Sequence, residues 1–95
     1  MSLQYVGTGR LGVTQNVAYT GTAGTVANGV NTGVYKVRVL TTTDAFVTTD
    51  GSTPSATNGA YVPALSPEYF TVTPGQKVSA VQVSGGGTLY VTEVS

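Results

Sequence analysis

The stretch that decides the fold class is Val34-Tyr35-Lys36-Val37-Arg38-Val39-Leu40. Successive side chains of an extended chain point to opposite faces. Tyr35, Val37 and Val39 therefore fall on one face. Lys36 and Arg38 fall on the other. This period of two predicts a half-buried β-strand whose apolar face, Tyr35 included, points into a core.

The segment after this strand predicts a second one. Residues 44–49, Asp-Ala-Phe-Val-Thr-Thr, are separated from it only by Thr41 to Thr43. Because such a short connection suits antiparallel neighbours, we expect the two strands to pair. Further on, residues 60–65 contain Pro63, which has no backbone N–H to donate and indicates an edge strand or an extended loop.

The C-terminal third predicts a meander of three strands. Residues 68–73 form the first, and Thr73-Pro74-Gly75-Gln76 has Pro and Gly where a type II turn requires them. A hairpin to residues 77–83 is expected there, with a bulge near Ser79-Ala80 where the alternation breaks. A glycine turn then leads to a last strand over 88–94, in which alternation directs Leu89 and Val91 inward and Tyr90 outward.

Composition extends this prediction to the whole chain. The 95 residues include 17 Thr and 16 Val, which favour strands, and 13 Gly and 4 Pro, which interrupt helices. We expect an all-β fold: a small β-sandwich or flattened barrel of six to eight short antiparallel strands. Residues 1–33, rich in Gly, Thr, Ala and Asn, are interpreted as an extended N-terminal arm with one or two strands. Residues 34–95 are the sandwich core of a single domain.

Charge and residue usage exclude several classes of function. Only 8% of residues are charged, with four cations and four carboxylates, so there is no basic stripe for nucleic acid. The chain has no Cys and no His, which removes thiolate chemistry, sulfur-ligated zinc and histidine-based catalysis. It contains no apolar run long enough for a membrane span and no secretory signal pattern, so we expect synthesis in a cytoplasm.

No motif in the sequence indicates a catalytic, cofactor or metal site. Residues 7–12 match a dinucleotide-binding glycine pattern, but no helix pattern follows and no acidic residue lies near residues 27–29. The four carboxylates are better explained as structural. Asp44 and Asp50 occupy turn-like positions suited to Asx hydrogen bonds, and Glu68 and Glu93 suit exposed strand positions. We therefore predict a protein that is not an enzyme and holds no cofactor.

Tyrosines and the scarcity of charge are the remaining functional signals. A free monomer normally carries a well-charged surface, and a chain that neighbours cover can dispense with it. The competing interpretation is an ordinary soluble domain hydrated by Thr, Ser, Asn and Gln. Tyrosine offers apolar area with a polar tip, and alternation places Tyr90 and Tyr69 outward and Tyr35 inward. The six tyrosines are Tyr5, Tyr19, Tyr35, Tyr61, Tyr69 and Tyr90.

Three segments, Val37 to Val47, Pro67 to Ser79 and Gly87 to Glu93, resemble small virion proteins of tailed bacteriophages. The resemblance implies a β-sandwich subunit of the capsid outer surface, a decoration or cement protein made in the host cytoplasm. Its implied partners are the major capsid protein and its own copies, often as a trimer, with no nucleic acid and no membrane. The N-terminal arm would be a clasp to the shell or to a neighbour.

Two alternatives stay open. The first is a head-tail connector, tail or head-fibre base component. The second is a carbohydrate-binding or adhesin-like β domain that uses outward tyrosines as stacking platforms.

Overall fold

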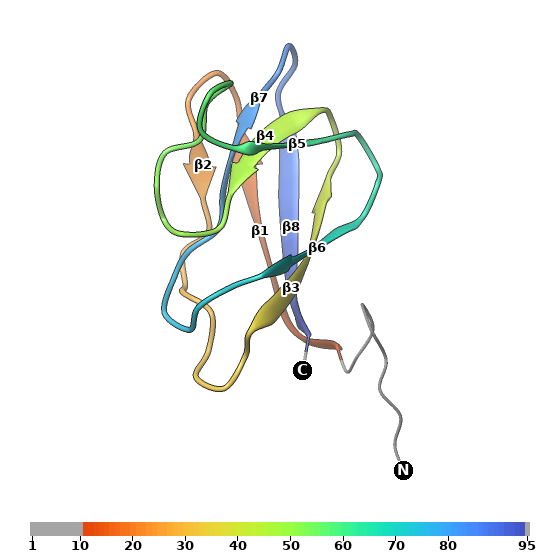
Figure 1. Ribbon diagram of the computed structural model, residues 1–95. Coiled ribbons are helices and arrows are strands. Elements are labelled where there is room, and N and C mark those ends of the chain that lie inside the picture. The colour runs from red at the N-terminus through yellow and green to blue at the C-terminus, as the bar shows by residue number, and fades with distance from the viewer. Residues whose placement is uncertain (1–10, 95) are drawn as a thin grey trace.

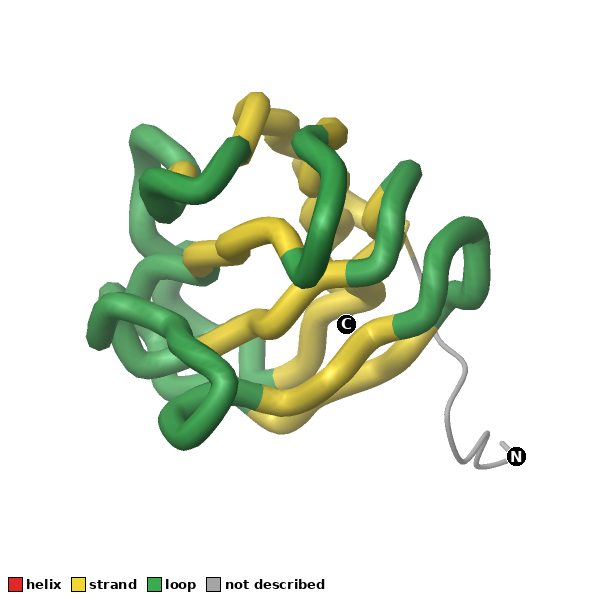
Figure 2. Tube along the Cα trace, turned by 90° about the horizontal axis from the view of Figure 1, so that it is seen from above, coloured by secondary structure: helices red, strands yellow, loops and turns green. Residues whose placement is uncertain are grey.

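Eight strands form two four-stranded antiparallel sheets in the computed structural model, which describes residues 11–94 (Figure 1). The strands are β1 (Leu11–Tyr19), β2 (Gly24–Thr25), β3 (Lys36–Thr41), β4 (Ala45–Thr48), β5 (Ala60–Val62), β6 (Glu68–Thr71), β7 (Ser79–Gln82) and β8 (Gly87–Val94). Sheet A has the order β1-β8-β3-β6, and sheet B has the order β2-β7-β4-β5. Within these residues every segment is strand or loop (Figure 2), so none is a helix able to cross a membrane. The all-β sandwich prediction is confirmed.

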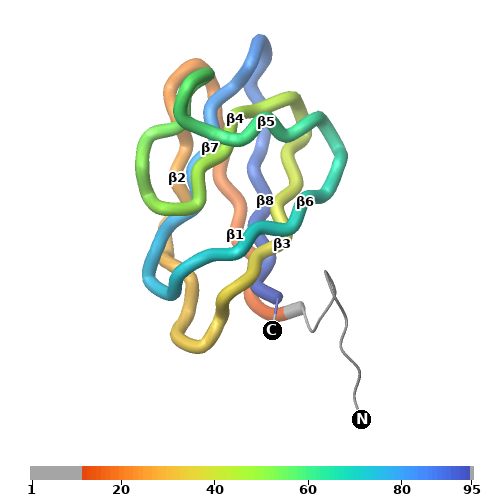
Figure 3. Tube along the Cα trace, in the orientation of Figure 1, coloured from red at the N-terminus to blue at the C-terminus, as the bar shows by residue number. Residues whose placement is uncertain are grey.

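The chain passes repeatedly from one sheet to the other. Only β4 and β5 are both consecutive and paired, whereas β1 pairs with β8 from the opposite end of the chain (Figure 3). Two four-stranded sheets linked in this way form a jelly roll. This topology closes the sandwich by contacts between residues far apart in sequence, such as Thr14 with Thr92.

The core lies between the sheets. Val37 and Val39 of β3 are fully buried, as the alternation in residues 34–40 predicts. They face small and β-branched side chains of sheet B, whose burial supplies most of the driving force for folding. The other buried apolar residues are Tyr19, Val26, Val30, Ala45, Val47, Val62, Val72, Val78, Ala80, Leu89, Val91 and Val94.

The N-terminal third contributes to this core. One or two strands are expected before Gly33, and the structure has two there, β1 and β2, which pair with β8 and β7. Tyr19, Val26 and Val30 are buried among the core residues. Within the described residues the sandwich therefore includes the chain from Leu11 onward, and not only from residue 34, because these three side chains bury apolar surface in its core. The arm prediction for residues 1–10 lies outside the described residues.

Two predictions of strand pairing are wrong. β3 and β4 lie in different sheets, so the short connection between them crosses the sandwich. The expected meander over β6, β7 and β8 is absent because these strands alternate between sheets. The turn itself is present: Gln76 N donates to Thr73 O at 3.1 Å, and Gly75 has φ of 92°. Pro74 and Gly75 fix the turn itself, whereas the burial of side chains decides which sheet each flanking strand joins.

Local details differ as well. β7 pairs in regular register through Ser79 and Ala80, and the register shift falls in β1, between Leu11 and Thr14. Tyr35, expected to point inward, is 63% exposed because β3 begins one residue later at Lys36.

Candidate contact surface

The outer face of sheet A carries two exposed tyrosines beside the cationic side chains of β3. Because Val37 and Val39 point into the core, Lys36, Arg38 and Leu40 of β3 point outward. Each lies beside a defined neighbour in the adjacent strands. Arg38 is paired with Thr92 of β8 on one side and with Tyr69 of β6 on the other. Leu40 is paired with Tyr90 of β8.

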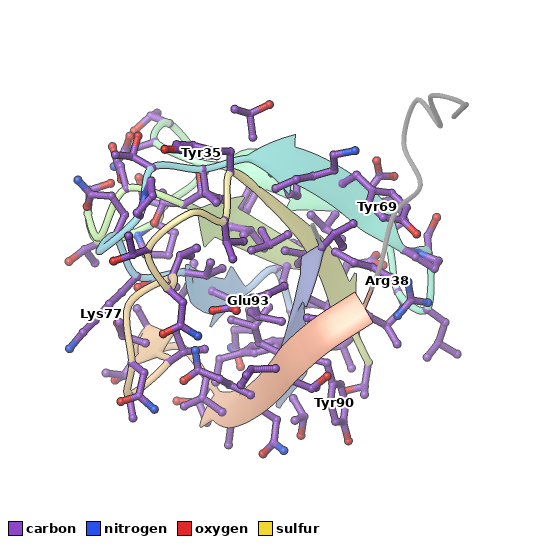
Figure 4. The ribbon with its side chains drawn as sticks, turned by 90° about the horizontal axis from the view of Figure 1, so that it is seen from below. Tyr35, Arg38, Tyr69, Lys77, Tyr90 and Glu93 are labelled. Atoms are coloured by element: carbon purple, nitrogen blue, oxygen red, sulfur yellow. The ribbon has the colours of Figure 1, made fainter. Side chains whose placement is uncertain are left out.

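We call the set Arg38, Leu40, Tyr69 and Tyr90 the tyrosine–arginine strip. Tyr69 is 43% exposed and Tyr90 is 38% exposed, whereas Arg38 and Leu40 are half-buried between them. Figure 4 shows Arg38, Tyr69 and Tyr90 on one side of the molecule, with Lys77 on the opposite side. Paired and diagonal neighbours in a sheet are about 5 to 8 Å apart, so the strip forms one continuous patch.

The chemistry of the strip favours a protein partner. Tyrosine and arginine are over-represented among the residues that dominate binding energy at protein interfaces. Within residues 11–94, Arg38 makes no hydrogen bond or ion pair, so its guanidinium has its five donors available. A guanidinium on a β-strand face can bind a carboxylate through two parallel hydrogen bonds. Lys36 on the same face adds a second positive charge near it.

A second aromatic cluster lies on sheet B, and its polar groups are already used. The rings of Phe46 and Tyr61 meet edge to face with centroids 5.9 Å apart. Tyr61 OH donates to Asp44 Oδ2 at 2.8 Å, and Ala64 N donates to Asp44 Oδ1 at 2.8 Å. The Tyr61 hydrogen bond, followed by that from Ala64, lowers the pKa of Asp44, and the same bond raises the pKa of Tyr61. This cluster ties the β3–β4 turn to the segment after β5.

Two of the other carboxylates, Asp50 and Glu93, also have structural roles. Asp50 Oδ1 accepts hydrogen bonds from Ser52 Oγ at 2.6 Å and Ser52 N at 3.0 Å, which lower the pKa of Asp50. This is the predicted Asx turn. Glu93, expected to be exposed, is 7% exposed and accepts hydrogen bonds from the backbone N and the Nδ2 of Asn31, both at 3.0 Å.

No candidate for metal or nucleotide binding emerges from the described residues. Within residues 11–94 there is no group of three or more Asp, Glu, His or Cys side chains that can hold a metal ion. In the glycine pattern of residues 7–12, residues 7–10 lie outside the described part. The chain continues into strand β1 where a nucleotide site requires a helix.

The tyrosine predictions have mixed outcomes. Tyr69 and Tyr90 are exposed, as the alternation predicts, and Tyr19 is buried with its hydroxyl bonded to Thr43. Tyr5 lies outside the described residues.

The sequence reasoning did not single out Arg38 as a contact residue. The alternation that places it opposite Val37 and Val39 is the signal that identifies it.

Comparison with known proteins gives little further information. No family model matches the chain, and no curated protein matches it. Among solved structures, the chain is similar to an RmlC-like cupin protein from Desulfovibrio desulfuricans. The two chains are 12% identical with a TM-score of 0.39, over 90% of this chain and 82% of that one. This level of similarity assigns neither a family nor an activity.

Proposed function

We propose that this chain is a non-enzymatic phage capsid-decoration protein that binds the outer surface of the head, with the tyrosine–arginine strip as its contact with the major capsid protein. The observation that carries the proposal is Arg38, which has no partner among residues 11–94 and lies on β3 beside Tyr69 of β6 and diagonally from Tyr90 of β8. The resemblance of three segments to small phage virion proteins supports the same function.

The low charge of the chain fits this role. A decoration subunit binds many equivalent positions on the shell. The binding free energy of each contact can therefore be modest while the total stabilisation of the shell is large. A strip of two tyrosines, one leucine and one arginine provides apolar area with one strongly directional cation. The proposed complement on the shell is an apolar patch that carries a carboxylate.

Glycan binding is the second candidate, and it rests on the same two exposed tyrosines, which can stack on sugar rings. The half-buried Leu40 and the available guanidinium favour a protein surface, where apolar packing and ion pairing occur together. A connector or tail component would use similar chemistry at far fewer positions.

The experiment is co-sedimentation of the purified chain with heads that lack it. Arg38→Glu is compared with Lys77→Glu, a charge reversal of an exposed lysine on the opposite side of the molecule (Figure 4). Loss of a dominant contact worth about 2 kcal/mol lowers affinity about 30-fold, so Arg38→Glu should fail to pellet at concentrations where Lys77→Glu still binds. Equal binding by the two variants would remove the strip from the contact. Absence of binding by the unmodified chain, together with retention on a glycan array, would replace the proposal with the glycan-binding alternative.

A further inference from the structure

The four edge strands of the sandwich differ in how they are protected. Sheet A ends in β1 and β6, and sheet B ends in β2 and β5. β6, β2 and β5 have 4, 2 and 3 residues. β6 begins at Glu68 directly after Pro67, and Pro63 directly follows β5. Short length, charge and proline are the usual means by which natural sheets prevent unwanted strand pairing.

β1 lacks these protections. It is 9 residues long, with no proline and no charge, and its register shift is confined to the end near Leu11. Within the described residues, β8 is its only partner strand, so one side of its backbone carries unpaired N–H and C=O groups.

Within residues 11–94, the segment that contains this edge is also free of charge. No Asp, Glu, Lys or Arg occurs from Leu11 to Tyr35, a run of 25 residues, and every charged side chain within residues 11–94 comes after it. More than half of residues 12–35 are exposed. Ordinary soluble surfaces are about 25 to 35% charged, so we call this region the neutral flank.

The β1 edge is held in place by side chains. Gln15 Nε2 donates to Asn28 O at 3.0 Å, and Asn28 N donates to Gln15 Oε1 at 3.0 Å. Thr14 and Thr92 share a hydrogen bond of 3.0 Å between their hydroxyls. These bonds fix the strand without using its free backbone edge. Little conformational entropy is therefore lost when another strand pairs with it.

We propose that the occupant of the β1 edge is β1 of a second copy of this chain, paired antiparallel about a two-fold axis. Residues close to such an axis lie beside their own copies, so a charge there would face a like charge, and a neutral flank avoids this repulsion. No other edge within residues 11–94 matches β1 in length. A three-fold ring built by edge pairing would place β1 against an edge of only 2 to 4 residues. We therefore favour the two-fold pair over the trimer that the resemblance implies.

The pairing has a consequence for the tyrosine–arginine strip. Antiparallel strands related by a two-fold axis perpendicular to their sheet keep the same face on the same side. Two copies would form one sheet of eight strands that presents both strips to one surface, which makes binding bivalent. This consequence rests on the proposed function, whereas the pairing itself does not.

The test is the molar mass of the chain alone, by sedimentation equilibrium over a concentration series. We expect a dimer of twice the 9.6 kDa chain mass. Ala18→Lys adds a charge at an exposed position of β1, and Ala60→Lys adds the same charge at an exposed position of the edge strand β5. Ala18→Lys should raise the dimer dissociation constant at least tenfold, and Ala60→Lys should leave it unchanged. A monomer at all concentrations, a trimer, or equal effects of the two variants would overturn the pairing.

A second measurement does not depend on added charge. Because the chain has no cysteine, single cysteines at Thr14, Asn16 and Ala18 can be cross-linked with a short thiol reagent, with Ala60→Cys as control. Cross-linked dimers from the β1 positions alone support the pairing, and their absence at all three overturns it. A dimer that does not bind phage heads would refute only the proposed function. A monomer that binds phage heads would refute only the pairing.

Discussion

Replacement of Thr41 by valine should stabilise the protein, although it deletes a polar group. Thr41 lies on the inward face of β3 and is fully buried, and its Oγ1 has no hydrogen-bond partner among residues 11–94. A buried hydroxyl without a partner costs about 1 to 3 kcal/mol in protein mutational data. Valine has nearly the same shape and replaces the hydroxyl by a methyl group, so the packing is kept and the cost is removed. We expect a gain of about 1 to 2 kcal/mol.

Thr48→Val is the matched control. Thr48 is 8% exposed, and its Oγ1 donates to Ser52 O at 2.6 Å. The same substitution there breaks a hydrogen bond and leaves the carbonyl oxygen unpaired, so we expect a loss of about 1 to 2 kcal/mol. Urea denaturation at one fixed protein concentration measures both changes. A gain of 1 kcal/mol corresponds to about 4 to 8 °C in Tm for a domain of this size. The reasoning is refuted if Thr41→Val destabilises the protein or if the two substitutions shift stability in the same direction.

Three further predictions concern the ends of the sandwich and its surface carboxylates. A Cβ on Gly87 would lie 2.6 Å from both Thr42 Oγ1 and Thr43 Oγ1, so Gly87→Ala should lower the free energy of unfolding by about 1 to 3 kcal/mol in urea denaturation. Gly85 has open space around it, so Gly85→Ala should leave the free energy of unfolding unchanged. Tyr19→Phe should cost about 1 to 2 kcal/mol in the same assay, because the hydroxyl that donates to Thr43 O at 2.8 Å and accepts from Thr43 N at 3.2 Å is lost; an unchanged midpoint would contradict this role. The pKa values of Asp44 and Asp50 are lowered below 3.8 in the folded state, so their contribution to stability is complete above pH 3.8 and is lost as the pH falls through the folded-state values. Tm measured against pH should therefore fall on the acid side, and Asp44→Asn should flatten that fall; an unchanged acid slope would argue against the Tyr61 and Ala64 hydrogen bonds.

The sequence predicts strands better than it predicts their partners. The alternation around Val37 and Val39 identifies β3 and its buried face, because burial on one face of a strand leaves a period of two. The jelly roll pairs β1 with β8, however, and no local pattern carries information about a contact between Thr14 and Thr92. The Pro74-Gly75 turn was predicted correctly, but the hairpin inferred from it was wrong. A tight turn limits the path of the chain over four residues and does not decide which sheet the next strand joins.

The contact surface could be predicted in part. Outward positions of Tyr69 and Tyr90 follow from alternation, and so does that of Arg38. Their arrangement as one patch depends on the β8-β3-β6 order, which is tertiary information. Glu93 shows the limit most clearly. The alternation that points Leu89 and Val91 inward also points Glu93 inward, but its partner Asn31, 62 residues away, which supplies two hydrogen-bond donors, could not be predicted from it.

The most direct test of the proposed function is the number of copies that bind each head at saturation, measured by quantitative mass spectrometry on purified particles. A decoration protein of the capsid surface should bind in a fixed, small-integer ratio to the subunits of the major capsid protein. A few copies per particle, independent of shell size, would contradict this and indicate a connector or tail component. No bound copies at any concentration would contradict the proposal altogether.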